Sequence, residues 1–337
     1  MSLRVGKLPA ELLARMLEMC RDDPRVVVRP GIGLDAAALA FGDKLVVVKS
    51  DPITFATDQI GWYAVNVNAN DVACLGARPR FFLATVLLPE GRADEALVEA
   101  IFSDLAASCE ELDVTLCGGH TEVTYGLDRP LVVGHMVGEV EPERLVRNER
   151  ARPGDEVLLT KGIAIEGTAL LAREKADELA GHLPAEALER ARGFLREPGL
   201  SVVPDAMAVC GAVLPHALHD PTEGGLATGL HELADAAGCG LEVDVGEVPV
   251  FEETRLICDH YGLEPLGVIA SGSLLVVTAP EHSDAALAAL EAAGVEAQRI
   301  GRILDRREGV MAIGEDGRKP LPRYDSDEVA RLFAREA

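Results

Sequence analysis

The sequence predicts an α/β protein that is built from two domains of similar size. Its 337 residues suffice for two domains, and 48% of them are apolar, so each half can bury a core of its own. Short apolar runs typical of buried strands alternate with segments in which apolar residues recur every three or four positions. A polar, turn-forming stretch at 152–155 separates the halves, so we expect domains at 1–150 and 151–337.

The first half reads as an α/β layer with mixed strand directions. Helices are expected where the apolar spacing is helical, strands where apolar residues run continuously, and turns where Gly and Asp cluster. In chain order the expected elements are helix 8–21, a hairpin turn at 42–43, strand 45–48 ending in polar residues 49–52, helix 58–79, strand 81–88, helix 94–112, strand 114–117, a glycine-rich turn at 118–122 and strand 131–140.

The second half repeats the alternation of strands and helices, which indicates a second α/β domain. In chain order its expected elements are strand 156–160, a helix opened by residues 166–168, helices 185–196 and 201–211, strand 212–218, a helix from the turn at 219–226 to Ala237, and strands near 241–244, 273–278 and 295–303 with helices between them.

Polar side chains interrupt the helix at 58–79 and predict a binding site. Asn66, Asn68, Asn70 and Asp71 lie in its centre, although Asn competes with backbone hydrogen bonding inside helices. A solvated face is the alternative, but such a face usually recruits Glu, Lys and Arg. We therefore expect Asn70 and Asp71 to face a polar ligand or a cation, with Gly76 as the C-cap.

Charge excludes several classes of function. The formal net charge is −24, from 56 acidic and 32 basic residues, which argues against binding to nucleic acid or to an anionic membrane. We find no signal peptide, no membrane span and no CxxC pair, so we expect a cytoplasmic protein. Its seven scattered cysteines are expected to be reduced and mostly in the core.

The remaining motifs suggest a nucleotide site without a P-loop. Asp35, Asp51 and Asp71 stand beside small or amide residues, and carboxylates are ligands that Mg²⁺ prefers. Glycine-rich turns lie at 118–119, 162–167 and 224–225, and the last two are expected to open helices, where backbone N–H groups suit a phosphate. Whether His120 and Lys161 take part stays open, because a hydrogen-bonded His and a solvated Lys are the structural alternatives.

Six segments together resemble the aminoimidazole-ribonucleotide (AIR) synthetase superfamily. They are GLDAAAL, KSDPITF, GWYAVNVNANDVACLGARP, GGHTEV, DPTEGGLA and ASGSLLVV, in this order. The branch they resemble most is that of the HypE-type hydrogenase-maturation and AIR-synthase-related proteins. The resemblance implies the two-domain PurM-like fold, a homodimer in which the N-terminal domains pair into a β-barrel, and ATP with Mg²⁺ as cofactors.

The resemblance also implies roles for individual residues. Asp35, Asp51 and Asp71 would hold the metal and the phosphates, and Asn70 would support Asp71. Gly118, Gly119 and Thr121 would line the nucleotide site. Asp220, Thr222, Gly224 and Gly225 would face the acceptor or the phosphates, so Asp71, Asp220 and Thr222 are the expected catalytic residues. The implied reaction activates a carbonyl or acid oxygen of a small-molecule or protein-borne acceptor by phosphorylation from ATP.

Two departures from the HypE-type pattern leave other functions open. The last cysteine is Cys258, whereas HypE-type proteins carry a tail cysteine, and Glu223 stands where that branch usually has Arg. The alternatives are a nucleotide-binding partner protein without catalysis, and a maturation factor that lacks the usual tail cysteine. Cys210 and Cys239 flank the DPTEGG turn, although their small apolar neighbours favour core positions.

Overall fold

The computed structural model describes residues 8, 10–19, 21–29, 31, 33–54, 58–324 and 326–336. The chain forms two compact units. The N-terminal unit contains residues 25–28 and 35–145, and the C-terminal unit contains residues from 146 onward together with α1 (Ala10–Leu17) and residues 29–34. Among the helices of the described part of the chain, none has the length and apolarity that crossing a bilayer requires.

A six-stranded mixed sheet forms the N-terminal unit, in the order β1-β2-β3-β6-β4-β5. Its strands are β1 (Val26–Val28), β2 (Ala37–Phe41), β3 (Lys44–Ile53), β4 (Arg78–Pro89), β5 (Thr115–Thr124) and β6 (Leu131–Val140). Only the pair β4 and β5 is parallel. The predicted hairpin turn is confirmed, because Phe41 pairs with Lys44 and Gly42 adopts a φ of 63° between them.

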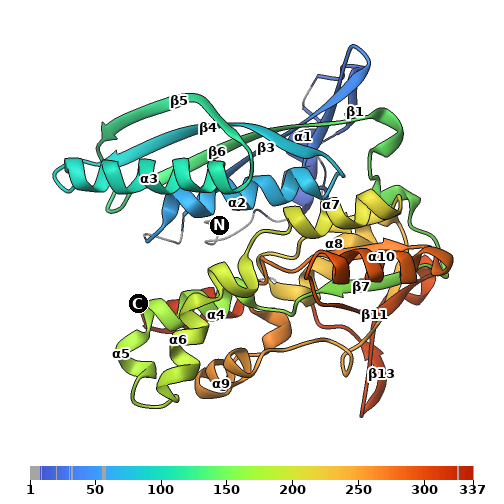
Figure 1. Cartoon of the computed structure of the whole chain (residues 1–337). Helices are drawn as coiled ribbons and strands as arrows, with labels where there is room; N and C mark the ends of the chain where they lie inside the picture. Colours follow the sequence, from blue (N-terminus) through green and yellow to red (C-terminus); the bar gives the residue numbers. More distant parts are fainter. Residues whose placement is uncertain are drawn as a thin grey trace. The chain divides into compact units, whose positions relative to one another are not determined.

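Helices α2 (Ile60–Ala73) and α3 (Glu95–Glu111) lie on one face of this sheet (Figure 1). All but one residue of α2 is buried, because the helix packs against both the sheet and α3. Glycines make this packing close: a Cβ at Gly138 of β6 would lie 2.4 Å from Val72 Cγ1. A Cβ at Gly61 of α2 would lie 2.5 Å from the Ile101 carbonyl oxygen of α3.

Three predictions for this unit are wrong in detail. Residues 49–52 continue strand β3 rather than follow it, and 118–122 belong to strand β5 rather than to a turn. Gly119 is required there because a Cβ would lie 1.9 Å from the Ala84 carbonyl oxygen of the neighbouring strand. Helix α2 ends at Ala73 with Cys74 as its C-cap, and Gly76, with φ 72°, closes the turn that follows.

The C-terminal unit contains a seven-stranded mixed sheet in the order β13-β12-β9-β11-β7-β10-β8. Its strands are β7 (Glu156–Thr160), β8 (Ala217–His219), β9 (Gly240–Asp244), β10 (Leu275–Thr278), β11 (Ala297–Leu304), β12 (Val310–Gly314) and β13 (Gly317–Pro320). The predicted strand 156–160 is confirmed. The one predicted at 212–218 is much shorter, since residue 212 still belongs to a helix. The sequence did not predict β12 and β13 separately.

Among the residues that the structure describes, eight further α-helices belong to the C-terminal unit, and several of them contribute to two separate hydrophobic clusters. The helices are α4 (Ile165–Glu174), α5 (Ala176–Leu179), α6 (Ala185–Gly193), α7 (Val203–Ala212), α8 (Gly225–Ala237), α9 (Glu252–Tyr261), α10 (Pro280–Ala292) and α11 (Glu328–Glu336). Leu226, Leu230 and Leu233 of α8 pack on the sheet in one buried cluster. Apolar residues of α4, α6, α9 and α11 form a second cluster. As predicted, two glycine-rich turns open helices, α4 and α8.

Candidate functional site

In the N-terminal unit, three aspartates predicted as metal ligands gather around one lysine. Lys49 Nζ lies 3.2 Å from Asp71 Oδ2 and 3.4 Å from Asp51 Oδ2. Asp35, which precedes β2, also acts electrostatically on Lys49. The fold therefore brings together residues that are 36 positions apart in the sequence, which no local pattern could establish.

Local structure explains how these side chains meet. Lys49 and Asp51 are two residues apart on β3, and alternation along a strand places them on the same face. Asn68 of α2 connects its helix to this strand, because its Nδ2 donates to the Asp51 carbonyl at 3.2 Å and to the Ala64 carbonyl at 2.8 Å. Gly134 of β6 leaves the space, since a Cβ there would lie 2.3 Å from Asn68 Nδ2.

The asparagines of α2 have different functions from one another. Asn66 Nδ2 donates to the Trp62 carbonyl one turn earlier, and Asn68 joins helix to strand, so both have structural roles. Asn70 and Asp71 are buried as well. The alternative of a solvated face is therefore excluded, while Asp71 does contact a cation, the Lys49 ammonium.

Lys49 remains charged in this environment. Burial alone would lower the pKa of its ammonium, but Asp71, Asp51 and Asp35 outweigh burial and raise the pKa well above its ordinary value. One positive charge faces three carboxylates, which are hard oxygen donors of the kind that hold Mg²⁺. Because an ammonium already stands among these donors, the residues fit a divalent cation. The sequence prediction missed Lys49, although its i, i+2 spacing from Asp51 was a usable signal.

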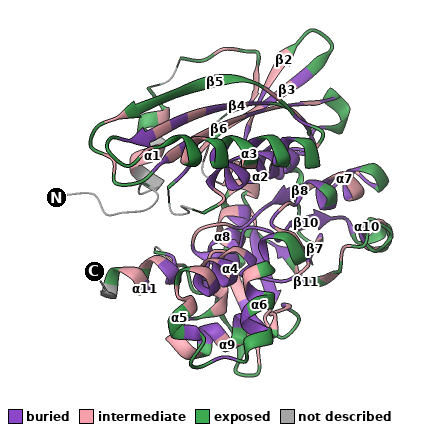
Figure 2. Ribbon diagram, turned by 60° about the vertical axis from the view of Figure 1, so that its left-hand side comes forward, coloured by how far each residue is buried: buried purple, intermediate pink, exposed green. Residues whose placement is uncertain are grey.

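Other predicted nucleotide residues lie on the edge strand β5. Gly118, Gly119 and Thr121 are exposed there, as is most of the strand (Figure 2). His120, between them, is also exposed, and its Nε2 lies 3.1 Å from Glu122 Oε2. A Cβ at Gly118 would meet only a leucine methyl at 3.8 Å, so packing does not require this glycine as it requires Gly119.

The DPTEGG turn of the C-terminal unit is fixed by backbone contacts. Gly224 and Gly225 adopt positive φ values of 80° and 67°, and α8 begins at Gly225. The Thr222 carbonyl accepts from the N–H groups of Gly225 at 3.0 Å and Ala270 at 3.3 Å. The Gly224 N–H donates to Asp327 Oδ2 at 2.8 Å, so a phosphate at this position would compete with a carboxylate.

Acidic side chains accumulate around this turn. Glu166, in the first turn of α4, is hydrogen-bonded to Ser271 and interacts with Asp327, Glu223 and Asp220. Burial, strengthened by these carboxylates, raises the pKa of Glu166 to about 7. Burial likewise raises the pKa of Asp327 to about 6, against the opposing effect of backbone N–H donors. The sequence prediction did not include Glu166 or Asp327 in the site.

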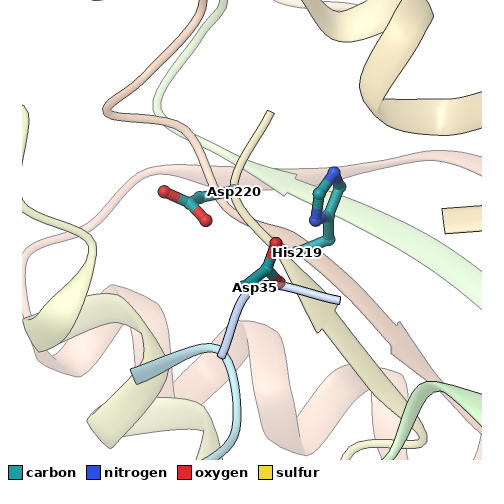
Figure 3. A group of neighbouring side chains, drawn as sticks. All are labelled: Asp35, His219 and Asp220. Carbon is teal, nitrogen blue, oxygen red and sulfur yellow. The ribbon is translucent and has the colours of Figure 1, made fainter. Parts of the chain in front are cut away.

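Asp220 follows His219 directly at the end of β8, and both side chains are buried. Figure 3 shows that the two side chains point in different directions. His219 Nε2 lies 3.4 Å from Glu232 Oε2 of α8. Asp35, labelled in the same view, belongs to the N-terminal unit.

Lys161 is a structural residue rather than a solvated one. Its Nζ donates to the carbonyls of Ser201 at 2.7 Å and Gly272 at 3.0 Å, and it lies 3.1 Å from Asp205 Oδ2. Burial lowers the pKa of Lys161, although Asp205 opposes that effect. Its contacts join two loops that are distant in sequence, and one of these loops contains Ser271, the partner of Glu166.

Most thiols of the described part of the chain are buried, as the sequence predicted. Cys210 is buried, and burial raises the pKa of Cys239 and raises that of Cys258 to about 12. Cys117 on β5 is exposed, and Cys20 lies outside the described residues.

Comparison with known proteins identifies the family. Residues 33–140 match the N-terminal domain of AIR synthase related proteins, and residues 152–314 match the C-terminal domain. Carbamoyl dehydratase HypE of Cupriavidus necator is 30% identical over 310 residues, which cover 89% of this chain and 84% of that protein. The chain belongs to the AIR synthase related family. The predicted resemblance to HypE-type proteins is thereby confirmed.

Solved structures of HypE proteins share the fold of this family member. HypE in complex with ATP matches with a TM-score of 0.68 and 25% identity, over 94% of this chain and 96% of that one. HypE in a HypE–HypF complex matches with a TM-score of 0.75 and 24% identity, over 93% and 99% of the two chains. The predicted two-domain PurM-like α/β fold with mixed sheets is confirmed.

Proposed function

We propose that this protein is an ATP- and Mg²⁺-dependent enzyme that phosphorylates, and so activates, a carbonyl or acid oxygen of its acceptor. The observation that carries the proposal is the gathering of Asp35, Asp51 and Asp71 around a single cation, Lys49. The relatives support it, since a carbamoyl dehydratase acts on a carbonyl-bearing group and a HypE protein was solved with ATP.

Each site residue has a task in this proposal. Asp35, Asp51 and Asp71 hold Mg²⁺, with Asn70 supporting Asp71. Bound Mg²⁺ supplies positive charge that stabilises the charge developing on the transferred phosphoryl group. The exposed backbone of Gly118, Gly119 and Thr121 lines the nucleotide site.

In the C-terminal unit, Asp220 and Thr222 orient the acceptor. Gly224 and Gly225 hold the turn in the one conformation that presents these two residues. A phosphate at this turn would have to displace Asp327 from the Gly224 N–H and the Thr222 carbonyl from the Gly225 N–H. The carboxylates around the turn favour an acceptor group that donates hydrogen bonds, such as an amide, over one that carries its own negative charge.

We further propose that the enzyme is a homodimer in which the N-terminal units of two copies pair into a β-barrel, with β5 at the junction. Supporting this, β5 is an edge strand that carries exposed Val123, exposed Tyr125 follows it directly, and exposed Phe81 lies on the neighbouring strand β4. The protein-borne acceptor is part of the same proposal, because one HypE protein was solved in a complex with HypF.

Calorimetry with ATP, with and without Mg²⁺, followed by an assay for ADP tests this function. We expect Mg²⁺-dependent binding and ADP release that rises with a carbamoyl-bearing acceptor. Asp71→Asn, which keeps the size of the side chain, should lower ADP release by about 100-fold or more. Binding without ADP release under any acceptor would instead identify a nucleotide-binding partner protein. Equal ADP release by the variant and the wild type would refute the proposed site.

A further inference from the structure

The three aspartates of the N-terminal unit already have a cation that belongs to the chain. Lys49 Nζ is within 3.4 Å of two carboxylate oxygens, and its side chain is 21% exposed. Asp71, by contrast, has only 8% of its side chain exposed. Without the positive charge of Lys49 beside it, the buried Asp71 carboxylate would face Asp51 and Asp35, and their mutual repulsion would oppose folding of this unit.

The lysine side chain is suited to leave this position. Its ammonium is a compact point charge on a flexible four-carbon stem, whereas Asp51 and Asp71 are anchored by β3 and by α2. Its partial exposure gives the stem a route toward solvent. A divalent cation carries twice the charge and binds the same hard oxygen donors, so ammonium and metal compete for one position.

From this geometry we infer that Lys49 is an exchangeable counter-ion: it neutralises Asp35, Asp51 and Asp71 while no metal is bound, and a divalent cation displaces it. The inference rests on the metal site of the proposed function and adds a means of regulating it. Lys49 lowers the affinity for Mg²⁺ and stabilises the unit in its absence. At low Mg²⁺ concentrations Lys49 therefore occupies the site, and the metal binds only when its concentration rises.

Thermal unfolding at increasing Mg²⁺ concentrations, at constant ionic strength, tests the exchange without any assay of activity. Lys49→Met removes the competing charge, so Mg²⁺ should stabilise this variant at a concentration at least about tenfold lower than it does the wild type. Lys49→Arg keeps the charge and should resemble the wild type. Lys44→Met is the matched control, because Lys44 is exposed on the same strand and pairs with half-buried Glu139.

A second measurement uses the wild type and does not depend on whether a variant folds. Acetylation of Lys49 by an amine-reactive reagent, followed by mass spectrometry, should be faster with Mg²⁺ than without it, because the displaced ammonium enters solvent. Acetylation of exposed Lys44 serves as the internal reference and should not change.

The results separate this inference from the proposed function. Equal Mg²⁺ dependence of Lys49→Met and wild type, or Lys49 acetylation that Mg²⁺ leaves unchanged or slows, would overturn the exchange even if the enzyme released ADP. Tighter Mg²⁺ binding by Lys49→Met would support the exchange even if no ADP were released.

Discussion

The two units of this protein each concentrate acidic residues, but they neutralise them differently. In the N-terminal unit, a lysine side chain is the counter-ion of Asp35, Asp51 and Asp71. In the C-terminal unit, protons and backbone N–H groups perform this task for Glu166 and Asp327. In the proposed exchange a metal ion replaces the ammonium of Lys49. The protonation of Glu166 and Asp327 instead depends on pH, and the N–H donor of Gly224 depends on the conformation of the turn. Similar acidic motifs therefore support different chemistry.

Asp220→Asn should separate the two regions most clearly. In the proposed function the metal is held by the N-terminal unit, so this variant should bind ATP with Mg²⁺ within about threefold of the wild type. Its ADP release should fall by about 100-fold or more, because the proposed function assigns to Asp220 the orientation of the acceptor. Calorimetry measures the binding of ATP, and an ADP assay on the same sample measures the turnover. A loss of binding equal to the loss of turnover would show that the two regions do not divide the work in this way.

Gly225→Ala should disrupt the backbone on which the C-terminal region depends. The added Cβ would lie 2.4 Å from the Leu266 carbonyl oxygen, at a position with φ 67°. We expect a loss of about 3 kcal/mol in the free energy of unfolding. Gly262→Ala has a similar φ of 62° and nothing within 4 Å of its Cβ, so its loss should be only about 1 kcal/mol. Urea denaturation measures the unfolding free energy of both variants. Equal losses would show that the close contact with the Leu266 carbonyl does not contribute to the cost at Gly225.

Glu166→Gln should change how stability depends on pH. The folded-state pKa of Glu166 is about 7, above its ordinary value of 4.5. Its stabilising contribution is therefore complete below pH 4.5 and is lost as the pH rises through 7. The neutral variant avoids this loss and should gain about 1–3 kcal/mol over the wild type between pH 5 and pH 8. Denaturant unfolding of the variant and the wild type at pH 5 and at pH 8 measures this gain. If the difference in unfolding free energy between the two proteins were the same at both pH values, the prediction would be contradicted.

Asp94→Ala should have the smallest effect. It measures how much a single hydrogen bond between a backbone N–H and an aspartate contributes to the free energy of unfolding. Asp94 is the N-cap of α3, and its Oδ1 accepts from the Leu97 N–H at 2.9 Å on the surface of the N-terminal unit. We expect a loss of about 1 kcal/mol in the free energy of unfolding. Asp94→Asn is the control, since it retains an acceptor and should lose less. Equal losses in the two variants would mean that this hydrogen bond contributes little.

Sequence patterns predicted most elements because local spacing determines them. Strands β6 and β7 and the end of α8 lie where the apolar periodicity indicated. The prediction failed where tertiary contacts override local preference. The residues Gly118 and Gly119 are typical of a turn, yet they form a strand, because β5 must approach the Ala84 backbone closely.

The candidate site was only partly predictable for a related reason. The three aspartates were recognisable by residue type and by resemblance, but that they meet at Lys49 depends on the packing of α2 against β3. Glu166 and Asp327 were not predicted, because 161 positions separate them in the sequence and only the folded C-terminal unit brings them close to the same turn. Spacing along one element is visible in a sequence, whereas contact between elements is not.

Helix α2 also makes the N-terminal unit observable on its own. Trp62, whose carbonyl accepts from Asn66, is the single tryptophan of the chain and is buried beside Tyr63, with ring centroids 5.5 Å apart. Its fluorescence therefore reports on the helix that carries Asp71. Tryptophan emission, followed together with circular dichroism of the whole chain, can separate the unfolding of one unit from that of the other without any attached label.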